Sequence, residues 1–134
     1  YVFPYSDSTY DVVFLISVFT HMMSADVRNY IREIARMLRP GGTCMLTTFL
    51  MDRGPHAAEW AFLYERDEAH YYNEAMPEVA VGYFLEFFQR RFAARGMLPA
   101  SEPLYGSWRR EPVSGSISGF PQDLLVFRKP WASH

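Results

Sequence analysis

The chain has 134 residues, a formal net charge of −2, and 49% hydrophobic and 17% aromatic residues. This length suits one domain with a real core, and the balanced charge without like-charge runs excludes nucleic acid as the main partner. No apolar stretch is long enough to span a bilayer, no signal segment opens the chain, and the single Cys44 can form no internal disulfide, so we expect a cytoplasmic protein without a membrane partner.

The first half of the chain predicts a strand, a helix and a second strand. Tyr10–Ile16 is an apolar run rich in β-branched residues, which is typical of a strand buried on both faces of a parallel sheet. Ser24 resembles an N-cap, and the apolar residues that follow it recur at helical spacing as far as Leu38. Thr43–Leu50 reads as a second buried strand, so this half predicts a βαβ unit.

The turn between this helix and the second strand is Arg39-Pro40-Gly41-Gly42. The residue before a proline avoids the α region, which ends the helix, and a glycine adopts a left-handed conformation at little cost. We therefore expect a positive φ at Gly41 or Gly42.

The second half predicts shorter elements. These are a helix over His56–Arg66, a loop or lid over His70–Val81, a helix over Tyr83–Arg95 with an apolar stripe of Phe84, Leu85, Phe88 and Phe92, a short strand near Glu102–Trp108, a turn over Glu111–Gly119 and a strand over Asp123–Arg128. Together the elements predict one α/β domain, in which parallel strands with helices carry a C-terminal antiparallel hairpin.

Two stretches resemble a known family. "FPYSDSTYDVVFLISVFTHM", followed after one helix by "LRPGGTCMLTTF", is similar to class I S-adenosylmethionine-dependent methyltransferases that act on small molecules, and "PQDLLVFRKP" is similar to the last strand of that family. The resemblance implies a partial Rossmann-like sheet, S-adenosylmethionine as the cofactor, and methyl transfer to a small-molecule acceptor.

The resemblance also implies that part of the family's domain is missing. The family binds the cofactor mainly through a Gly-rich loop after its first strand and an acidic residue after its second, and this sequence contains neither. We therefore expect residues 1–134 to be the C-terminal portion of a methyltransferase domain. The missing N-terminal half would then bind most of the cofactor, and this portion alone would be inactive.

The resemblance assigns Ile16, Ser17 and Val18, at the end of the first strand, to the methionine part of the cofactor. Ligands of open α/β sheets bind beyond the carboxyl ends of the strands, which supports that position. The alternative is a plain strand end packed on a helix. His21 follows in the same loop and is the candidate catalytic residue, as a base or a substrate contact; the alternative is that it caps or bridges the following helix.

Aromatic residues of the second half could close over a substrate and exclude water. The candidates for this lid are Tyr71, Tyr72, Tyr105 and Trp108, and the alternative is that they fill the core. His56 and His70 lie near three carboxylates in the sequence, but their spacing fits no metal-binding pattern, so we predict no metal site.

A different class of function also fits the sequence, namely a non-catalytic α/β module that mediates protein association. The strand around Val12–Leu15 would lack a neighbour on one side, and an unpaired apolar strand edge is a template for pairing with another chain. We expect either a homodimer joined at this edge or coverage of the edge by Tyr1–Tyr5.

Overall fold

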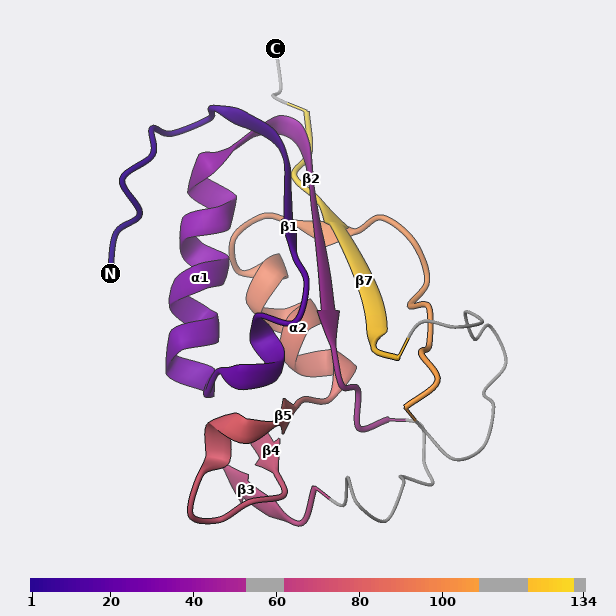
Figure 1. The fold of residues 1–134 in the computed structure, drawn as a ribbon. Helices are drawn as coiled ribbons and strands as arrows, with labels where there is room; N and C mark the ends of the chain where they lie inside the picture. The colour runs from indigo at the N-terminus through magenta and orange to yellow at the C-terminus, as the bar shows by residue number, and fades with distance from the viewer. Residues whose placement is uncertain (53–61, 109–120, 132–134) are drawn as a thin grey trace.

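The computed structural model describes residues 1–52, 62–108 and 121–131. Four strands form the main sheet in the order β1 (Tyr10–Leu15), β2 (Leu38–Thr48), β7 (Asp123–Arg128) and β6 (Leu98–Pro99). A second, smaller sheet has the order β3 (Tyr64–Arg66), β4 (Ala69–Tyr71) and β5 (Val81–Gly82) (Figure 1). The α/β class, with parallel and antiparallel strands in one sheet, is the class that the sequence predicts. The predicted helix over His56–Arg66 and the turn over Glu111–Gly119 fall wholly or mainly on residues outside the described ranges.

The βαβ unit forms as predicted. It consists of β1 (Tyr10–Leu15), α1 (Ser24–Met37) and β2 (Leu38–Thr48), and β1 pairs with β2 in parallel. The N-cap assignment is wrong: Met23 holds the capping position, and the Ser24 hydroxyl instead donates to Asp67 Oδ2 at 2.6 Å. Ser24 therefore links α1 to a distant segment rather than capping its own helix.

The Pro-Gly-Gly turn lies within the bounds of β2, so this strand begins earlier than the predicted Thr43. Tyr10 pairs with Leu38 and Val12 with Thr43, so the residues between Leu38 and Thr43 form an irregularity in the pairing. Gly41 has a φ of +82°, as predicted for one of the two glycines, and its N–H donates to the Lys129 carbonyl at 2.7 Å. This turn thus joins the start of β2 to the end of the last strand.

The C-terminal strands are antiparallel. β7 (Asp123–Arg128) has the predicted bounds and pairs with β2 on one side and with β6 (Leu98–Pro99) on the other. The strand predicted near Glu102–Trp108 is wrong, because that segment has isolated bridges at Leu104 and Tyr105 in place of a strand, and Leu104 pairs with Leu124. The antiparallel pair of the prediction therefore exists, but with an earlier first strand.

Helix α2 (Leu85–Ala93) is shorter than the predicted Tyr83–Arg95, but its buried face keeps Phe88 and Phe92 of the predicted stripe, and Leu85 packs partly buried against the core. Phe87, Phe88 and Phe92 are buried, whereas Phe84 is 46% exposed and meets the His70 ring edge-on. The ring of Phe92 stacks on Phe127 of β7 with centroids 4.1 Å apart, which fixes α2 against the sheet.

The small sheet replaces the loop or lid predicted over His70–Val81 and the end of the predicted middle helix. Its strands are β3 (Tyr64–Arg66), β4 (Ala69–Tyr71) and β5 (Val81–Gly82), with the short helix η3 (Pro77–Val79) between the last two. The β3–β4 turn attaches the sheet to both helices, because Asp67 pairs with Arg28 at 2.8 Å and Glu68 pairs with Arg91 at 2.7 Å.

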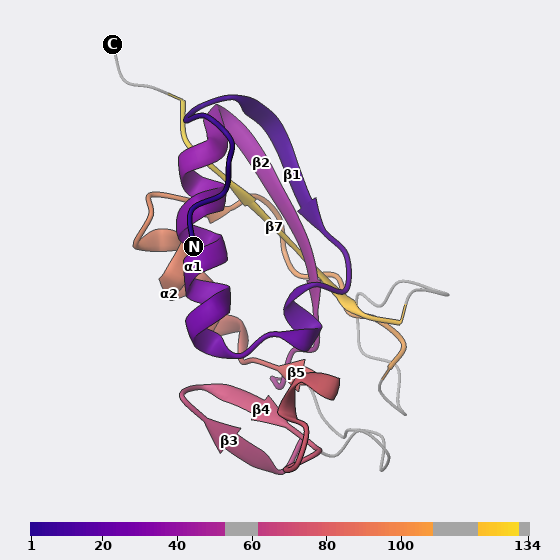
Figure 2. The same cartoon turned by 60° about the vertical axis from the view of Figure 1, so that its left-hand side comes forward.

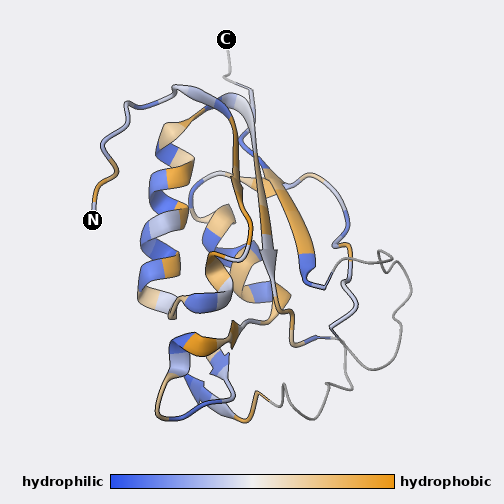
Figure 3. Ribbon diagram, viewed as in Figure 1, coloured by the Kyte–Doolittle hydropathy of each residue, from blue (hydrophilic) through white to orange (hydrophobic). Residues whose placement is uncertain are grey.

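Both helices lie on the same side of the main sheet (Figure 2). The side chains that alternate toward them are buried, including Leu15, Cys44, Leu46, Leu125 and Phe127. On the opposite side Val12 is 53% and Phe14 67% exposed. The prediction that this first strand is buried on both faces is therefore wrong for the described residues. Figure 3 shows that β1 consists mostly of hydrophobic residues.

The N-terminal segment lies along α1 and not along the edge of β1. The Phe3 N–H donates to Glu33 at 2.8 Å, and Arg36 donates to the carbonyl oxygens of Phe3 and Tyr5. The hydrogen bond from Arg36 holds the pKa of Glu33 below its usual value. The second option for the β1 edge, coverage by Tyr1–Tyr5, is thus wrong in this structure.

We predict that Gly41→Val lowers the free energy of unfolding by about 1–2 kcal/mol, the cost of left-handed backbone for an L-residue. A Cβ at Gly41 would also lie 2.7 Å from the Trp131 ring. Gly96→Val is the matched control for strain alone, since Gly96 has a φ of +75° and no atom within 4 Å of the added Cβ. Urea denaturation measures both variants, and wild-type stability in Gly41→Val would contradict the turn.

Candidate functional site

The candidate site lies where β1 and β2 end and β7 begins. β1 and β2 are parallel, so their carboxyl ends meet at one edge of the sheet, and antiparallel β7 brings Gln122 and Asp123 to the same edge. The residues Ile16–Val18 connect β1 to the short helix η1 (Phe19–His21) at this edge. This is the position at which open α/β sheets bind ligands.

Ser17 adopts an unusual backbone conformation in this loop. Its φ is +57°, in the left-handed region that non-glycine residues rarely occupy. Its N–H donates to Thr47 Oγ1 at 2.8 Å, and Gln122 Nε2 donates to Ser17 Oγ at 2.8 Å. Thr47 in turn donates to Gln122 Oε1 at 2.6 Å, so the three residues form a closed ring of hydrogen bonds.

Asp123 anchors the polypeptide beneath this ring. Its side chain is fully buried, and it accepts hydrogen bonds from the Leu50 N–H at 2.8 Å, the Gly106 N–H at 2.8 Å and Trp108 Nε1 at 3.1 Å. Burying a carboxylate is costly unless donors surround it. These donors come from the segment after β2 and from residues 106–108, so Asp123 fixes both segments beside the site.

An apolar groove of about 380 Å³ adjoins the ring on the open face of the sheet. Phe14, Ile16, Met45, Thr47 and Leu124 contribute to its lining, so Thr47 belongs to both features. The groove has almost no polar surface besides this threonine, and it can accommodate the apolar body of a ligand whose polar group reaches Ser17.

His21 ends η1, and its Nδ1 lies 3.0 Å from the Glu78 carbonyl oxygen of η3. A carbonyl oxygen can only accept, so Nδ1 carries the proton in this contact and the neutral ring keeps the lone pair on Nε2. His21 thus bridges to η3 and not to the following helix α1, and its Nε2 keeps a lone pair that can accept a proton.

The four predicted lid aromatics lie in three different environments. Tyr71 is buried in β4, stacked on Tyr64, and Tyr105 belongs to the main core. Tyr72 and Trp108 meet in a smaller apolar cluster, each against the ring of Phe62. The structure thus brings only the last two together, near the segment that Asp123 anchors.

The described residues offer neither a metal-binding cluster nor a reactive thiol. They hold no group of three or more His, Cys, Asp or Glu side chains that could bind a metal ion. Burial raises the pKa of the Cys44 thiol to about 12, so the thiol remains protonated and a weak nucleophile. Across the same residues, no helix has both the length and the hydropathy needed to cross a membrane.

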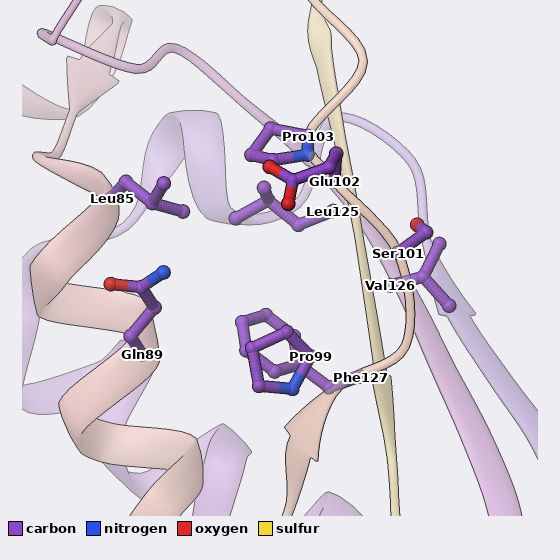
Figure 4. A pocket seen from close by; sticks show the side chains of 9 residues that line it. All are labelled: Leu85, Gln89, Pro99, Ser101, Glu102, Pro103, Leu125, Val126 and Phe127. Carbon is purple, nitrogen blue, oxygen red and sulfur yellow. The ribbon is translucent and has the colours of Figure 1, made fainter.

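A second pocket, of about 160 Å³, lies between α2 and the segment that leads from β6 to Pro103 (Figure 4). Leu125 and Phe127 form its apolar floor, and Gln89 and Glu102 lie on opposite walls. It shares no lining residue with the groove beside Ser17, and no part of the site geometry depends on it.

Sequence reasoning missed Thr47, Gln122 and Asp123. The signal was present, since polar residues at the end of one predicted strand and at the start of an antiparallel neighbour must meet at one sheet edge. The sequence analysis placed the last strand in a C-terminal hairpin and not beside β2, so it did not predict that Thr47 and Gln122 lie close together.

Comparison with known proteins supports the resemblance to methyltransferases. A family model described as a methyltransferase domain matches residues 2–46. Among solved structures, the chain is similar to the Burkholderia thailandensis 1,6-didemethyltoxoflavin-N1-methyltransferase with bound 1,6-didemethyltoxoflavin and S-adenosylhomocysteine, with a TM-score of 0.58 and 16% identity over 93% of this chain and 46% of that chain.

Two further neighbours have the same fold. One is a chain of the complex between the Haloferax volcanii Trm112 methyltransferase activator and a methyltransferase. Its TM-score is 0.62, with 19% identity over 98% of this chain and 59% of that chain. The other is the [4+2]-cyclase SpnF, with a TM-score of 0.59 and 16% identity over 97% of this chain and 53% of that chain. The chain has the methyltransferase fold and spans about half the length of these three neighbours.

We predict that Asp123→Asn destabilises the chain by about 1–3 kcal/mol, because an amide NH₂ would replace one of two oxygens that face buried donors. Glu102→Gln is the control, since this exposed carboxylate accepts none of the hydrogen bonds that surround Asp123. Urea denaturation monitored by Trp fluorescence compares the two. Equal stability of both variants would show that the network around Asp123 contributes little.

Proposed function

We propose that this chain is the C-terminal portion of a methyltransferase domain that transfers a methyl group from S-adenosylmethionine to a small-molecule acceptor in the cytoplasm. The observation that carries the proposal is the strained Ser17 loop at the carboxyl end of β1, within the region that matches the methyltransferase family model. Backbone held in sparsely populated conformations concentrates at functional sites.

The described residues fit one end of such a cofactor. The loop Ile16–Val18 offers backbone groups and the Ser17 hydroxyl beside an apolar groove, which suits the amino-acid end of S-adenosylmethionine. The sulfonium supplies an already reactive methyl group when bound, so the protein has mainly to orient the acceptor and exclude water. Tyr72 and Trp108, which both pack against Phe62, are the proposed aromatic side chains that exclude water from the acceptor.

His21 is the proposed base of this reaction. A hydroxyl or amine acceptor loses a proton during methyl transfer, and Nε2 of His21 can take it, because the contact with Glu78 keeps the other ring proton on Nδ1. A carbonyl partner on the second nitrogen also fixes the orientation of the ring.

The remaining cofactor contacts are proposed to come from outside this sequence. The sequence contains neither the Gly-rich loop that follows the family's first strand nor the acidic residue that follows its second strand. The chain also spans about half the length of its structural neighbours. The Gly-rich loop, the acid for the ribose hydroxyls and most of the adenine pocket would belong to the N-terminal half of the domain.

We predict that residues 1–134 alone bind S-adenosylhomocysteine too weakly for isothermal titration calorimetry at micromolar concentration. In a millimolar titration followed by amide chemical shifts, the changes should centre on Ile16, Ser17 and Val18. Micromolar affinity would contradict the division of the cofactor site, and shifts confined to other residues would contradict the proposed position of the cofactor.

The second candidate function is protein association, and the open edge of β1 favours it. Among the described residues β1 pairs only with β2, and Phe14 and Ile16 are 67% and 62% exposed. The [4+2]-cyclase SpnF has the same fold, so the fold alone does not determine one function. A homodimer joined edge to edge at β1 would pair the free backbone groups.

We predict that the wild-type chain dimerises at high concentration and that Phe14→Lys shifts it toward monomer, because a charge on an edge strand opposes pairing. Leu98→Lys, on β6 at the other edge of the sheet, is the matched control. Light scattering measures both. A wild-type chain that stays monomeric, with fast amide exchange along Val12–Leu15, would contradict association at this edge.

A further inference from the structure

The ring of Ser17, Thr47 and Gln122 connects three segments that are distant in sequence. The partners of its hydrogen bonds are 30, 75 and 105 residues apart. The ring links the loop after β1, the end of β2 and the residue before β7, which are the three segments that form the candidate site. A ring of this kind couples the positions of all three.

The direction of each hydrogen bond follows from the groups involved. The Ser17 N–H can only donate, so Thr47 Oγ1 accepts from it. Thr47 is 2% exposed, and its hydroxyl hydrogen needs an acceptor, which Gln122 Oε1 provides. Gln122 Nε2 must then face Ser17 and donate to its hydroxyl oxygen.

The Ser17 hydroxyl is the last group in this series of hydrogen bonds, and it can still donate. The Ser17 hydroxyl accepts from Gln122, and among the described residues its own hydrogen has no recorded acceptor. Ser17 is exposed, whereas Thr47 lies at the edge of the apolar groove. The ring thus orients a hydroxyl donor toward the space above the strand ends.

We propose that Thr47 and Gln122 are positioning residues that hold Ser17 in its left-handed conformation and direct its hydroxyl hydrogen to an acceptor oxygen of a bound ligand. The ligand has an apolar or aromatic body beside Phe14 and Leu124 and a carboxylate or hydroxyl group at Ser17. This inference rests on the proposed function and extends it, since it assigns the ring a role in ligand binding.

The left-handed conformation supports a functional role for the ring. A serine at a φ of +57° is strained, and glycine would occupy this position without strain. Serine at this position provides a hydroxyl that glycine lacks. The ring supplies two hydrogen bonds to Ser17, which offset the cost of the backbone conformation.

The test uses the ¹⁵N-labelled chain and three variants. Thr47→Val keeps the volume of Thr47 and removes its hydroxyl, Thr47→Ser restores the hydroxyl, and Ser17→Gly keeps the positive φ but removes the donor. Two quantities are measured: the amide exchange rate of residue 17 in the free chain, and the affinity for S-adenosylhomocysteine from amide chemical shifts. A parallel titration uses 5′-methylthioadenosine, which has the nucleoside but no carboxylate.

Thr47→Val should speed the exchange of the Ser17 amide and weaken S-adenosylhomocysteine binding, each by about fivefold to tenfold, as expected for one lost hydrogen bond. Thr47→Ser should restore both values. Ser17→Gly should weaken binding of S-adenosylhomocysteine as well. If Ser17→Gly does not weaken the binding of 5′-methylthioadenosine, the acceptor of the Ser17 hydrogen bond is the carboxylate. If Ser17→Gly weakens the binding of both ligands equally, the acceptor lies on the nucleoside.

Unchanged amide exchange in Thr47→Val would overturn the positioning role of the ring, and wild-type affinity in Ser17→Gly would overturn the role of the hydroxyl. The failure of the proposed function has a different signature. A wild-type chain without chemical-shift changes at Ile16–Val18 would contradict cofactor binding there and the ligand role of the ring, whereas the exchange rates of the free chain would still decide the positioning role.

Discussion

The buried carboxylate of Asp123 is the interaction on which the rest of the site depends. It accepts from Leu50 N–H, Gly106 N–H and Trp108 Nε1, and so joins the end of β2 to the segment that carries Trp108. Its neighbour Gln122 then reaches Thr47 and Ser17. A buried carboxyl group that accepts from two separate segments makes the start of β7 a fixed reference for the loops around it.

The one-sided core is the second constraint. Both helices pack on one side of the main sheet, where Phe92 stacks on Phe127, and the opposite side leaves Phe14 and Met45 exposed. The apolar groove at Ser17 lies on this open side. The site therefore combines a rigid polar edge, set by the ring and Asp123, with an apolar surface that the described residues leave uncovered.

The sequence predicted the regular elements well where the periodicity and the turn residues agreed. The bounds of β7 are exact, and Gly41 has the expected positive φ, because backbone rules act locally. The role of Ser24 and the exposed face of β1 depend on distant partners, which no local pattern encodes. Thr47 and Gln122 were missed for the same reason, since their importance arises only when β7 lies beside β2.

The groove and the ring share Thr47, so the open face and the site are not independent. Any chain segment that covers Phe14, Met45 and Leu124 also removes water from the neighbourhood of Ser17. In such an environment of lower dielectric constant, the hydrogen bonds of the ring and a bond from the Ser17 hydroxyl to a ligand become stronger. A covering segment that leaves room for the ligand body beside Phe14 and Leu124 should therefore favour ligand binding at Ser17, whereas a segment that fills the groove should compete with the ligand.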